Sequence, residues 1–457
     1  MSNRYLYITL LSLLGLSQEA CAQALAQSPR LVVNITVDHL RTDYLETYTP
    51  LYGPDGLQRL LQQGVVYTNG SYGFSPVDRA SAAAALSTGT SPYYNGIAAM
   101  EWLDRETLRP QYCVRDAQQT VSPVHLATST LGDELKIATS GVARVFSFAP
   151  TAECAILSAG HAADGAAWIA QGRWSTTSYY APVNQWLNGF ARLEVPAADG
   201  NMSVVAAALK CVEQAGIALD EKTDMLCLTL STNSLMEDYV ALDRAVAHLI
   251  QGVEGSVPRD RVLFVLSGTG SSEEREEEVN GRFRIPTGTF YINRTANLLN
   301  MYLGAVFGMD RYVEACYKNH IFLNHKTIRQ KNLNLGDVQR RSQEFLLQIA
   351  GVRNVYTSNQ LMTSDSYQLE RIRNGFNVEK SGDLIVGVAP GWKLVNEDTH
   401  EQVLSRAANI PFPIIFYGAG LKAQRLPQTV TADRIAPTVA RLIRIRAPNA
   451  CSSEPLF

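Results

Sequence analysis

Short apolar runs alternate along this chain with longer segments of helical periodicity. This alternation predicts an α/β fold with a mainly parallel central sheet. The clearest expected strands are 31–37, 144–148, 224–230, 262–267, 383–388 and 413–417, and the clearest expected helices are 55–63, 80–88, 203–215, 238–252, 291–305, 337–350 and 433–443. In such sheets, residues that follow the carboxyl ends of the strands gather at one edge. We therefore expect Asp38, residues 231–233 and residues 268–270 to lie close together.

Two long stretches interrupt the expected strands. Residues from about 95 to 200 are rich in loops, and residues from about 272 to 380 are rich in helical patterns. Loops and insertions vary without disturbing a sheet, so we expect both stretches to form cap regions over the strand ends. These caps are the surfaces on which we expect a partner to bind.

The first 22 residues have the pattern of an export signal. Arg4 precedes an apolar stretch at 5–16, and residues 20–22 (Ala-Cys-Ala) have the small-x-small form that a signal peptidase cleaves. The apolar stretch is too short to span a bilayer, and no later segment is long enough. We therefore predict a signal peptide at 1–22 and a periplasmic chain. A lipoprotein anchored at Cys21 is the weaker alternative, because residues 18–20 are polar.

Charge and cysteine spacing narrow the expected partners. The net charge of −3 gives no reason to expect nucleic acid or an anionic membrane as a partner. The cysteines after residue 22 show no C-x-x-C spacing that would chelate zinc. Disulfides and buried free thiols both remain open for them.

Several short motifs in a fixed order carry a family resemblance. They include 37–45 (VDHLRTDYL), 87–92 (STGTSP), 112–116 (YCVRD), 155–161 (AILSAGH), 174–180 (WSTTSYY) and 435–438 (IAPT). With them the chain resembles the alkaline phosphatase superfamily, and within it the periplasmic phosphate-irrepressible type found in Bacteroidetes. The resemblance implies a three-layer alkaline-phosphatase-like sandwich over 23–457. It also implies an active site in which two zinc ions activate a nucleophilic Thr or Ser and stabilise the phosphoryl group.

The metal-ligand positions implied by this resemblance are mostly replaced. Asp38 matches the first ligand carboxylate. Asn233 stands where the second ligand block has Asp, and that block lacks its histidine. Gly268 and Thr269 replace two ligands of the third block. His400 could be the remnant of the last ligand, although a surface histidine fits its surroundings at least as well. The resemblance therefore implies a metal site without most of its ligands.

The catalytic positions implied by the resemblance are replaced as well. The nucleophile falls on Arg79, whose guanidinium stays protonated near neutral pH, while a shift of register would offer Ser81. The phosphate-binding Asn falls on Met100, and the Lys-x-Arg pair falls on Thr151 and Glu153. A neutral group and an acid in place of two cations would repel a phosphate dianion.

The leading interpretation is an exported pseudoenzyme with no catalytic residues, no zinc or other cofactor, and a protein or small-ligand partner in the periplasm. The alternative is a divergent zinc-dependent phosphomonoesterase or phosphodiesterase that uses Asp38, Asp78, Ser81 and His400. In the pseudoenzyme, we expect Arg79 to lie against Asp38 and to replace the lost metal charge.

Two further expectations concern the surroundings of the site. A small ligand could bind in the pocket that corresponds to the active site of the family. Its aromatic wall would be formed by Trp102, Trp174, Tyr179 and Tyr180, although core packing is the commoner role of such aromatics. The resemblance implies that His161 shapes the surroundings of the site and does not bind metal, because active members share its Ala-Gly-His stretch.

Overall fold

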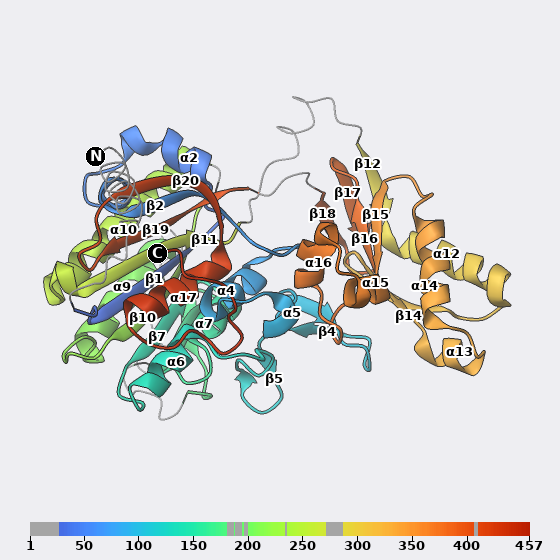
Figure 1. The fold of residues 1–457 in the computed structure, drawn as a ribbon, viewed down its shortest axis with the longest axis horizontal. Helices are drawn as coiled ribbons and strands as arrows, with labels where there is room; N and C mark the ends of the chain where they lie inside the picture. The colour runs from blue at the N-terminus through green and yellow to red at the C-terminus, as the bar shows by residue number, and fades with distance from the viewer. Residues whose placement is uncertain are drawn as a thin grey trace, which may run out of the picture.

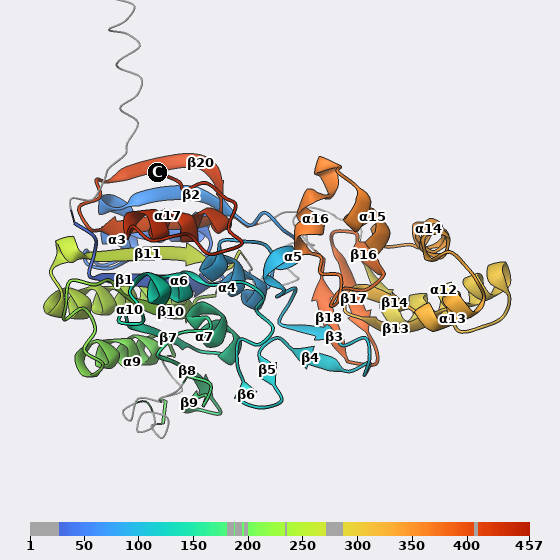
Figure 2. The same cartoon turned by 60° about the horizontal axis from the view of Figure 1, so that its bottom comes forward.

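The computed structural model describes residues 27–180, 187, 194–195, 200–233, 235–270, 287–405 and 410–457. The predicted signal peptide at 1–22 lies outside these residues. The described chain forms two lobes (Figures 1 and 2), a larger lobe around a central sheet and a smaller lobe drawn in yellow and orange. Among the helices described, none is both long and apolar enough to cross a membrane.

A nine-stranded sheet in the order β20-β2-β19-β11-β1-β10-β7-β8-β9 forms the centre of the larger lobe. Its strands are β1 (Leu31–Asp38), β2 (Val65–Ser71), β7 (Val145–Ala149), β8 (Gly165–Ala170), β9 (Arg173–Thr176), β10 (Asp224–Ser231), β11 (Val262–Gly268), β19 (Phe412–Gly418) and β20 (Gln424–Thr431). The central strand β1 runs parallel to both β10 and β11, whereas β19 runs antiparallel to β11 and β2. The predicted mainly parallel sheet is confirmed.

Helices cover both faces of this sheet. One face carries α3 (Leu57–Gln63), α9 (Gly200–Gln214) and α10 (Met236–Ser256), and the other carries α4 (Arg79–Thr88), α6 (Leu131–Ala138), α7 (Ala152–Ala159) and α17 (Ile435–Leu442). Successive strand residues point to opposite faces, so Val32 joins one core while Leu31 and Val33 join the other. Burial on both sides explains why the sequence of β1 is almost continuously apolar. The helix α2 (Thr42–Thr47) follows β1 directly.

The first predicted cap region is shorter than expected. Among its described residues, α5 (Pro92–Asn95) and the hairpins β3 (Glu101–Leu103) with β4 (Pro110–Tyr112) and β5 (Arg115–Asp116) with β6 (Thr120–Val121) lie outside the central sheet and the helices that cover it. From α6 onward the chain returns to the larger lobe, where β7, β8 and β9 extend the sheet. The predicted range 95–200 therefore combines a true insertion with sheet strands, because its loops concealed two of those strands.

The smaller lobe has two sheets of its own. One is β13 (Val313–Tyr317), β14 (His320–Leu323), β16 (Leu384–Val388) and β15 (Val352–Thr357), and the other is β12 (Gly288–Tyr291), β17 (Trp392–Asn396) and β18 (Glu401–Leu404). Its helices are α12 (Ile292–Phe307), α13 (His325–Gln330), α14 (Leu335–Leu346), α15 (Ser358–Thr363) and α16 (Glu370–Gly375). The expected strand 383–388 is thus β16 of this lobe, which continues beyond residue 380. A buried apolar run does not show which of two sheets it joins.

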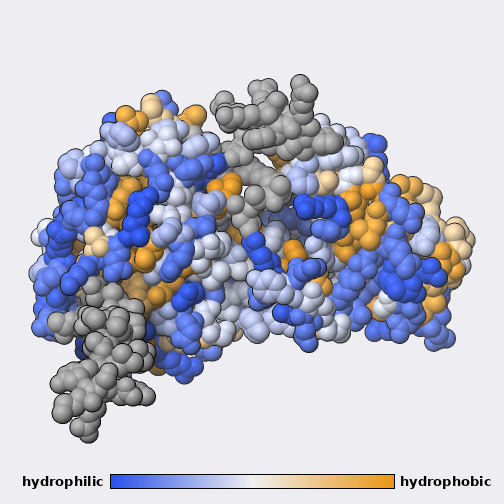
Figure 3. All heavy atoms as spheres, turned by 45° about the horizontal axis from the view of Figure 1, so that its top comes forward, coloured by the Kyte–Doolittle hydropathy of each residue, from blue (hydrophilic) through white to orange (hydrophobic). Residues whose placement is uncertain are grey.

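The face seen in Figure 3 is mostly hydrophilic, and hydrophobic residues gather on the smaller lobe at its right. Exposed apolar side chains of this lobe include Leu298, Met301 and Met309, on and just after α12. The cysteines in the described residues are free thiols, and Cys113, Cys154, Cys211 and Cys227 are buried.

Candidate functional site

The predicted convergence of strand ends occurs at the carboxyl edge of the central sheet. The parallel register places Asp38 beside Ser231, and Val37 beside Gly268. The Asp38 residue is 7% exposed, and its Oδ1 accepts a hydrogen bond of 2.5 Å from the Thr269 hydroxyl. The Nε2 atom of His39 lies 3.5 Å from the other carboxylate oxygen of Asp38. The carboxylate is therefore held by side chains of its own protein.

The donor atoms at this edge do not fit a zinc ion. Asn233 is exposed, Gly268 has no side chain, and the Thr269 hydroxyl donates to Asp38. Within the described ranges, no group of three or more His, Cys, Asp or Glu side chains is arranged to hold a metal ion. Protein zinc sites use three or four nitrogen, sulfur or carboxylate ligands. One carboxylate with a hydroxyl partner does not supply them.

Aromatic side chains fill the space beside Gly268. The buried Tyr72 donates a hydrogen bond of 2.9 Å to the Gly268 carbonyl, and its ring centroid lies 5.3 Å from that of Phe412. A Cβ atom added at Gly268 would lie 2.8 Å from the Cβ of Phe412, closer than real Cβ contacts. A ligand side chain at this position therefore needs a shift of the surrounding structure. Burial, with the nearby Asp38 charge, raises the pKa of Tyr72 well above its usual value.

The replaced catalytic positions form a second cluster. Arg79 opens α4, and its Nε lies 2.6 Å from Oε1 of Glu153 in the first turn of α7. The Nη2 atom of Arg79 lies 3.5 Å from the Met100 sulfur. The Glu153 side chain is 2% exposed, and it also accepts a hydrogen bond from the Tyr112 hydroxyl. Three positions that the family resemblance assigned to catalysis and phosphate binding are thus in direct contact.

Arg79 pairs with Glu153 and not with Asp38, so the expected Arg79–Asp38 contact is wrong. Burial lowers the pKa of the Arg79 guanidinium, but the Glu153 carboxylate outweighs this effect and the pKa is raised overall. Asp38 contributes to this rise only through its more distant charge. The physical reason is that Glu153 places a fully buried carboxylate within direct reach of Arg79. Thr151 precedes α7 as its N-cap residue.

Of the four residues of the divergent-enzyme alternative, Asp78 and Ser81 are in contact with each other, whereas His400 lies on the smaller lobe. Asp78 caps α4 by accepting hydrogen bonds from the Ser81 backbone N–H and hydroxyl, both at 2.9 Å. Ser81 is completely buried, so its hydroxyl serves the helix cap. His400 lies in an exposed turn between β17 and β18 of the smaller lobe. The surface-histidine reading of His400 agrees with this position.

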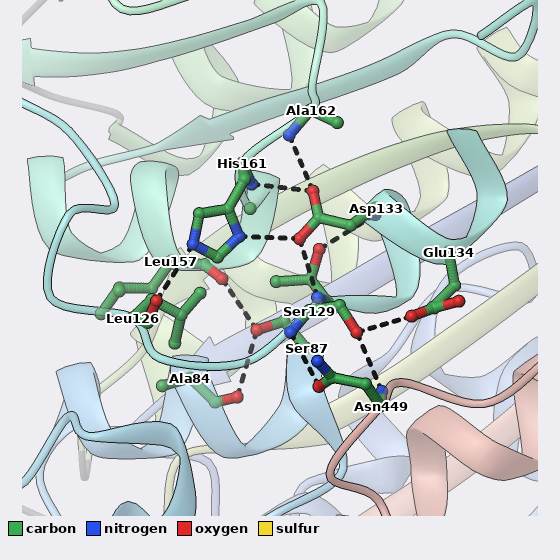
Figure 4. A network of polar contacts seen from close by, with 12 residues as sticks. Ala84, Ser87, Leu126, Ser129, Asp133, Glu134, Leu157, His161, Ala162 and Asn449 are labelled. Atoms are coloured by element: carbon green, nitrogen blue, oxygen red, sulfur yellow. Dashed lines mark hydrogen bonds and ion pairs between the residues drawn. The ribbon is translucent and has the colours of Figure 1, made fainter. Parts of the chain in front are cut away.

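His161 belongs to a polar network on the side of α4 that faces α6 and α7 (Figure 4). Its Nδ1 lies 3.0 Å from Oδ2 of Asp133, and its Nε2 lies 3.0 Å from the Leu126 carbonyl. Asp133 also accepts hydrogen bonds from the backbone N–H groups of His161 and Ala162. Both ring nitrogens therefore face acceptors, which favours the doubly protonated imidazolium. The network joins α6 to the loop after α7.

Sequence reasoning missed two residues and misjudged part of the aromatic wall. Tyr72 and Tyr112 complete the two clusters, and only Tyr112 stood in a recognised motif, at 112–116. Trp174 packs against Phe148 in the core, and the buried Tyr180 hydroxyl donates to the Gly160 carbonyl. Core packing, the commoner role of aromatics, thus accounts for these two.

A mainly parallel α/β sheet whose strand ends carry the metal positions, with an inserted second lobe, is the architecture of the alkaline phosphatase superfamily. A model of the type I phosphodiesterase/nucleotide pyrophosphatase family matches residues 32–409, so the chain belongs to that family. It is 25% identical to the alkaline phosphatase PafA of Elizabethkingia meningoseptica over 94% of each chain. It is 26% identical to a Myroides odoratus protein described as a calcium-transporting ATPase, again over 94% of each chain.

The crystal structure of PafA has the same fold as this chain. The two align with a TM-score of 0.83 at 23% identity, over 94% of this chain and 99% of PafA. Murine ectonucleotide pyrophosphatase/phosphodiesterase 5 aligns with a TM-score of 0.53 at 11% identity. The predicted alkaline-phosphatase-like fold and the resemblance to the PafA type are confirmed.

Proposed function

We propose that this protein is a pseudoenzyme of its family, exported to the periplasm, which keeps the phosphatase scaffold as a binding or structural module. The Arg79–Glu153 ion pair carries this proposal. In the pattern implied by the family, a neutral hydroxyl residue and a cation stand at these two positions. Here the cation stands at the nucleophile position and an acid stands at the phosphate-binding position. The exchange lowers the summed charge of the two positions from +1 to zero and removes both chemical roles.

Electrostatics support this reading. A phosphate dianion needs cations or hydrogen-bond donors directed at its oxygens. The buried Glu153 carboxylate occupies one such position and neutralises the nearest guanidinium. The Asp38 edge supplies one carboxylate toward two metal ions, and Tyr72 and Phe412 fill the space beside Gly268. We therefore propose that the protein binds no zinc and hydrolyses no phosphate ester by the two-zinc route.

Metal content and hydrolysis, measured together, test this proposal. The full chain is purified in zinc-containing buffer and dialysed, its zinc is measured by elemental analysis, and an aryl phosphate and an aryl phosphodiester are offered as substrates. PafA, treated in the same way, is the positive control. We expect background zinc and hydrolysis no faster than buffer. About two zinc ions per chain with zinc-dependent hydrolysis would instead establish the divergent phosphatase.

Export is tested separately, because the pseudoenzyme proposal does not depend on it. The full-length gene is expressed in a Gram-negative host, and the host is fractionated by osmotic shock. We expect the chain in the periplasmic fraction with residues 1–22 removed, as N-terminal sequencing of the product would show. Retention in the cytoplasm at full length would contradict export, whereas a lipid-modified Cys21 would establish the lipoprotein alternative.

A further inference from the structure

A cavity of about 410 Å³ lies between the two lobes, beside the start of α4. Residues 75–78, 98–99 and 101–103 of the larger lobe and its hairpin form one wall. Strands β13, β14, β16, β17 and β18 contribute to the opposite wall, in the smaller lobe. Neither Arg79 nor Glu153 lines this cavity, so it is distinct from the cluster that they form. Its volume is in the range of sites that bind small organic molecules.

The lining is mostly apolar and includes three aromatic rings. Trp102, Tyr317 and Phe322 lie on it, and branched aliphatic side chains such as Ile385 and Val388 come from the smaller lobe. Trp102 is the one member of the predicted aromatic wall that reaches this cavity. A lining of this kind favours a ligand with an apolar or aromatic body.

Three carboxylates line the cavity, and none of them forms an ion pair with another described residue. Asp78 accepts hydrogen bonds from Ser81 and Met100, which leaves Glu101 and Glu401 to be considered. Glu101 accepts one hydrogen bond, of 3.1 Å, from the Tyr317 hydroxyl. Glu401 makes neither an ion pair nor a side-chain hydrogen bond with the part of the chain that the structure describes. Burial raises the pKa of Tyr317, and the charges of Glu101 and Glu401 raise it further. Both carboxylates therefore act on the same phenol, at one end of the cavity.

The cations on the lining are largely occupied by other groups. The Lys380 ammonium donates to the Gly96 and His125 carbonyls and lies 4.5 Å from the centroid of the Trp102 ring. Burial lowers the pKa of Lys380 to about 8 and that of His320 to about 4, so His320 is neutral at neutral pH. Lys318 lies 5.8 Å from the centroid of the Tyr317 ring. The lining thus carries three carboxylates (Asp78, Glu101 and Glu401) and two ammonium groups (Lys318 and Lys380), so negative charge is in excess.

We propose that this cavity binds a small organic cation, an ammonium group on an apolar or aromatic body. The ammonium lies between Glu101 and Glu401, and the body packs against Trp102 and the aliphatic wall. Aromatic faces at the same end add cation–π attraction. This inference goes beyond the proposed function, since it holds whether or not the chain hydrolyses phosphate esters.

A matched series of ligands tests the sign of the charge. The full chain is titrated with 3-phenylpropylamine, 3-phenylpropanol and 3-phenylpropanoate, which share one body and differ in the charge of the head group. Calorimetry reports binding, and so does the intrinsic tryptophan fluorescence, to which Trp102 on the cavity lining contributes. We expect saturable binding of the amine, at least about tenfold weaker binding of the alcohol, and the weakest binding of the carboxylate. Equal or tighter binding of the carboxylate, or no saturation by the amine, would overturn the proposal.

Substitutions then locate the interaction. We expect Glu401→Gln, which loses no internal partner, to weaken amine binding about five- to tenfold. We expect Glu101→Gln/Glu401→Gln to weaken it further, and neither variant to change the affinity for the alcohol. Glu106→Gln makes the same change of charge on the exposed β3–β4 turn and serves as the control. An equal loss for alcohol and amine, or an unchanged amine affinity in both variants, would contradict the proposed site.

Discussion

Asp38 and Glu153 are both buried carboxylates near the carboxyl edge of the central sheet, yet the chain stabilises them in different ways. Asp38 holds a position implied for a metal ligand, and it is now held by the Thr269 hydroxyl and the neighbouring His39. Glu153 stands where the family pattern implies a cation, and it has the counterion Arg79. Burying an ionised group is costly unless it is paired or hydrogen-bonded. The Asp38 carboxylate thus matches the family pattern while the positions around it differ from that pattern. At the Arg79–Glu153 pair, both positions differ from the pattern, and their opposite charges balance each other.

Under the proposed function, the two regions also differ in what prevents the chemistry of the family. At the Asp38 edge, Tyr72 and Phe412 occupy the space beside the replaced ligand position, so the obstacle is steric. At the Arg79–Glu153 pair the obstacle is electrostatic, because both residues have the wrong charge for a phosphate. Four measurements of stability can break or sharpen this contrast.

Gly268→Asp should have the largest effect. A Cβ there meets Phe412 at 2.8 Å, and the new carboxylate would be buried near Asp38. Overpacking and an added buried charge should together lower the free energy of unfolding by about 4 kcal/mol. Urea unfolding measures this change, and the same variant dialysed against zinc should bind none. Gly255→Asp, where an added Cβ meets nothing within 4 Å, is the control. A stable Gly268→Asp variant that gained zinc would show that the edge is still a metal site.

Part of the fold and part of the candidate site could be predicted from the sequence. Strand periodicity was sufficient to bring Asp38 and Gly268 to one edge, because parallel strands end together. The order of family motifs was sufficient to relate Arg79, Met100 and Glu153, which the fold then brings into contact. The partner of Arg79 was predicted as Asp38 but is Glu153. The sequence could not distinguish these two acids, because the pairing depends on distances of a few ångströms.

The packing beside Gly268 and the sheet to which residues 384–388 belong could not be predicted, for a different reason. Tyr72 follows β2 with no motif to mark it, and it reaches Gly268 because β2 and β11 both neighbour β19. The strand 384–388 has the same apolar character as the central strands, and its place in the second sheet depends on pairing with β14 and β15. Contacts between segments far apart in the sequence decide both cases, and local patterns do not record them.

Arg79→Met tests the charge-balanced region. It leaves the Glu153 carboxylate buried without its counterion, which in a fully buried pair costs about 3–5 kcal/mol. The Arg79 side chain is 39% exposed and water screens the pair, so we expect a smaller loss of about 2–3 kcal/mol in urea unfolding. Arg79→Met/Glu153→Gln should recover most of this loss, because it removes both charges. If the double variant were as unstable as the single one, packing and not charge would explain the effect.

Thr269→Val tests the hydrogen-bonded carboxylate. The change removes the hydroxyl that donates to Asp38 at 2.5 Å and preserves the shape of the side chain. A hydrogen bond to a charged group contributes about 1.5–3 kcal/mol, and His39 still faces the carboxylate, so we expect a loss of about 1–2 kcal/mol. Thr289→Val, at an exposed position of β12 whose hydroxyl has no hydrogen bond to another described residue, is the control, with little expected change. A loss larger than that of Arg79→Met would reverse the comparison between the two regions.

His161 and Asp133 provide a third pair, in which the counterion of a buried carboxylate titrates. The hydrogen bond to Asp133 raises the pKa of His161 above its ordinary value of 6.5. The stability that this pair contributes is therefore complete below pH 6.5 and is lost as the pH rises through the raised pKa. The His161 side chain is 36% exposed, so we expect a loss of less than about 1 kcal/mol.

Urea unfolding between about pH 5.5 and 8.5 measures this dependence. His161→Gln should flatten the decline above pH 6.5, whereas His248→Gln, at an exposed histidine of α10, should retain it. Arg79 stays protonated throughout this range, so Arg79→Met should lower the whole curve without changing its slope. An identical slope in the wild type and His161→Gln would show that Asp133 does not need a charged partner. Asp133 would then depend on its hydrogen bonds, and the Arg79–Glu153 pair would differ from it in depending on a permanent counterion.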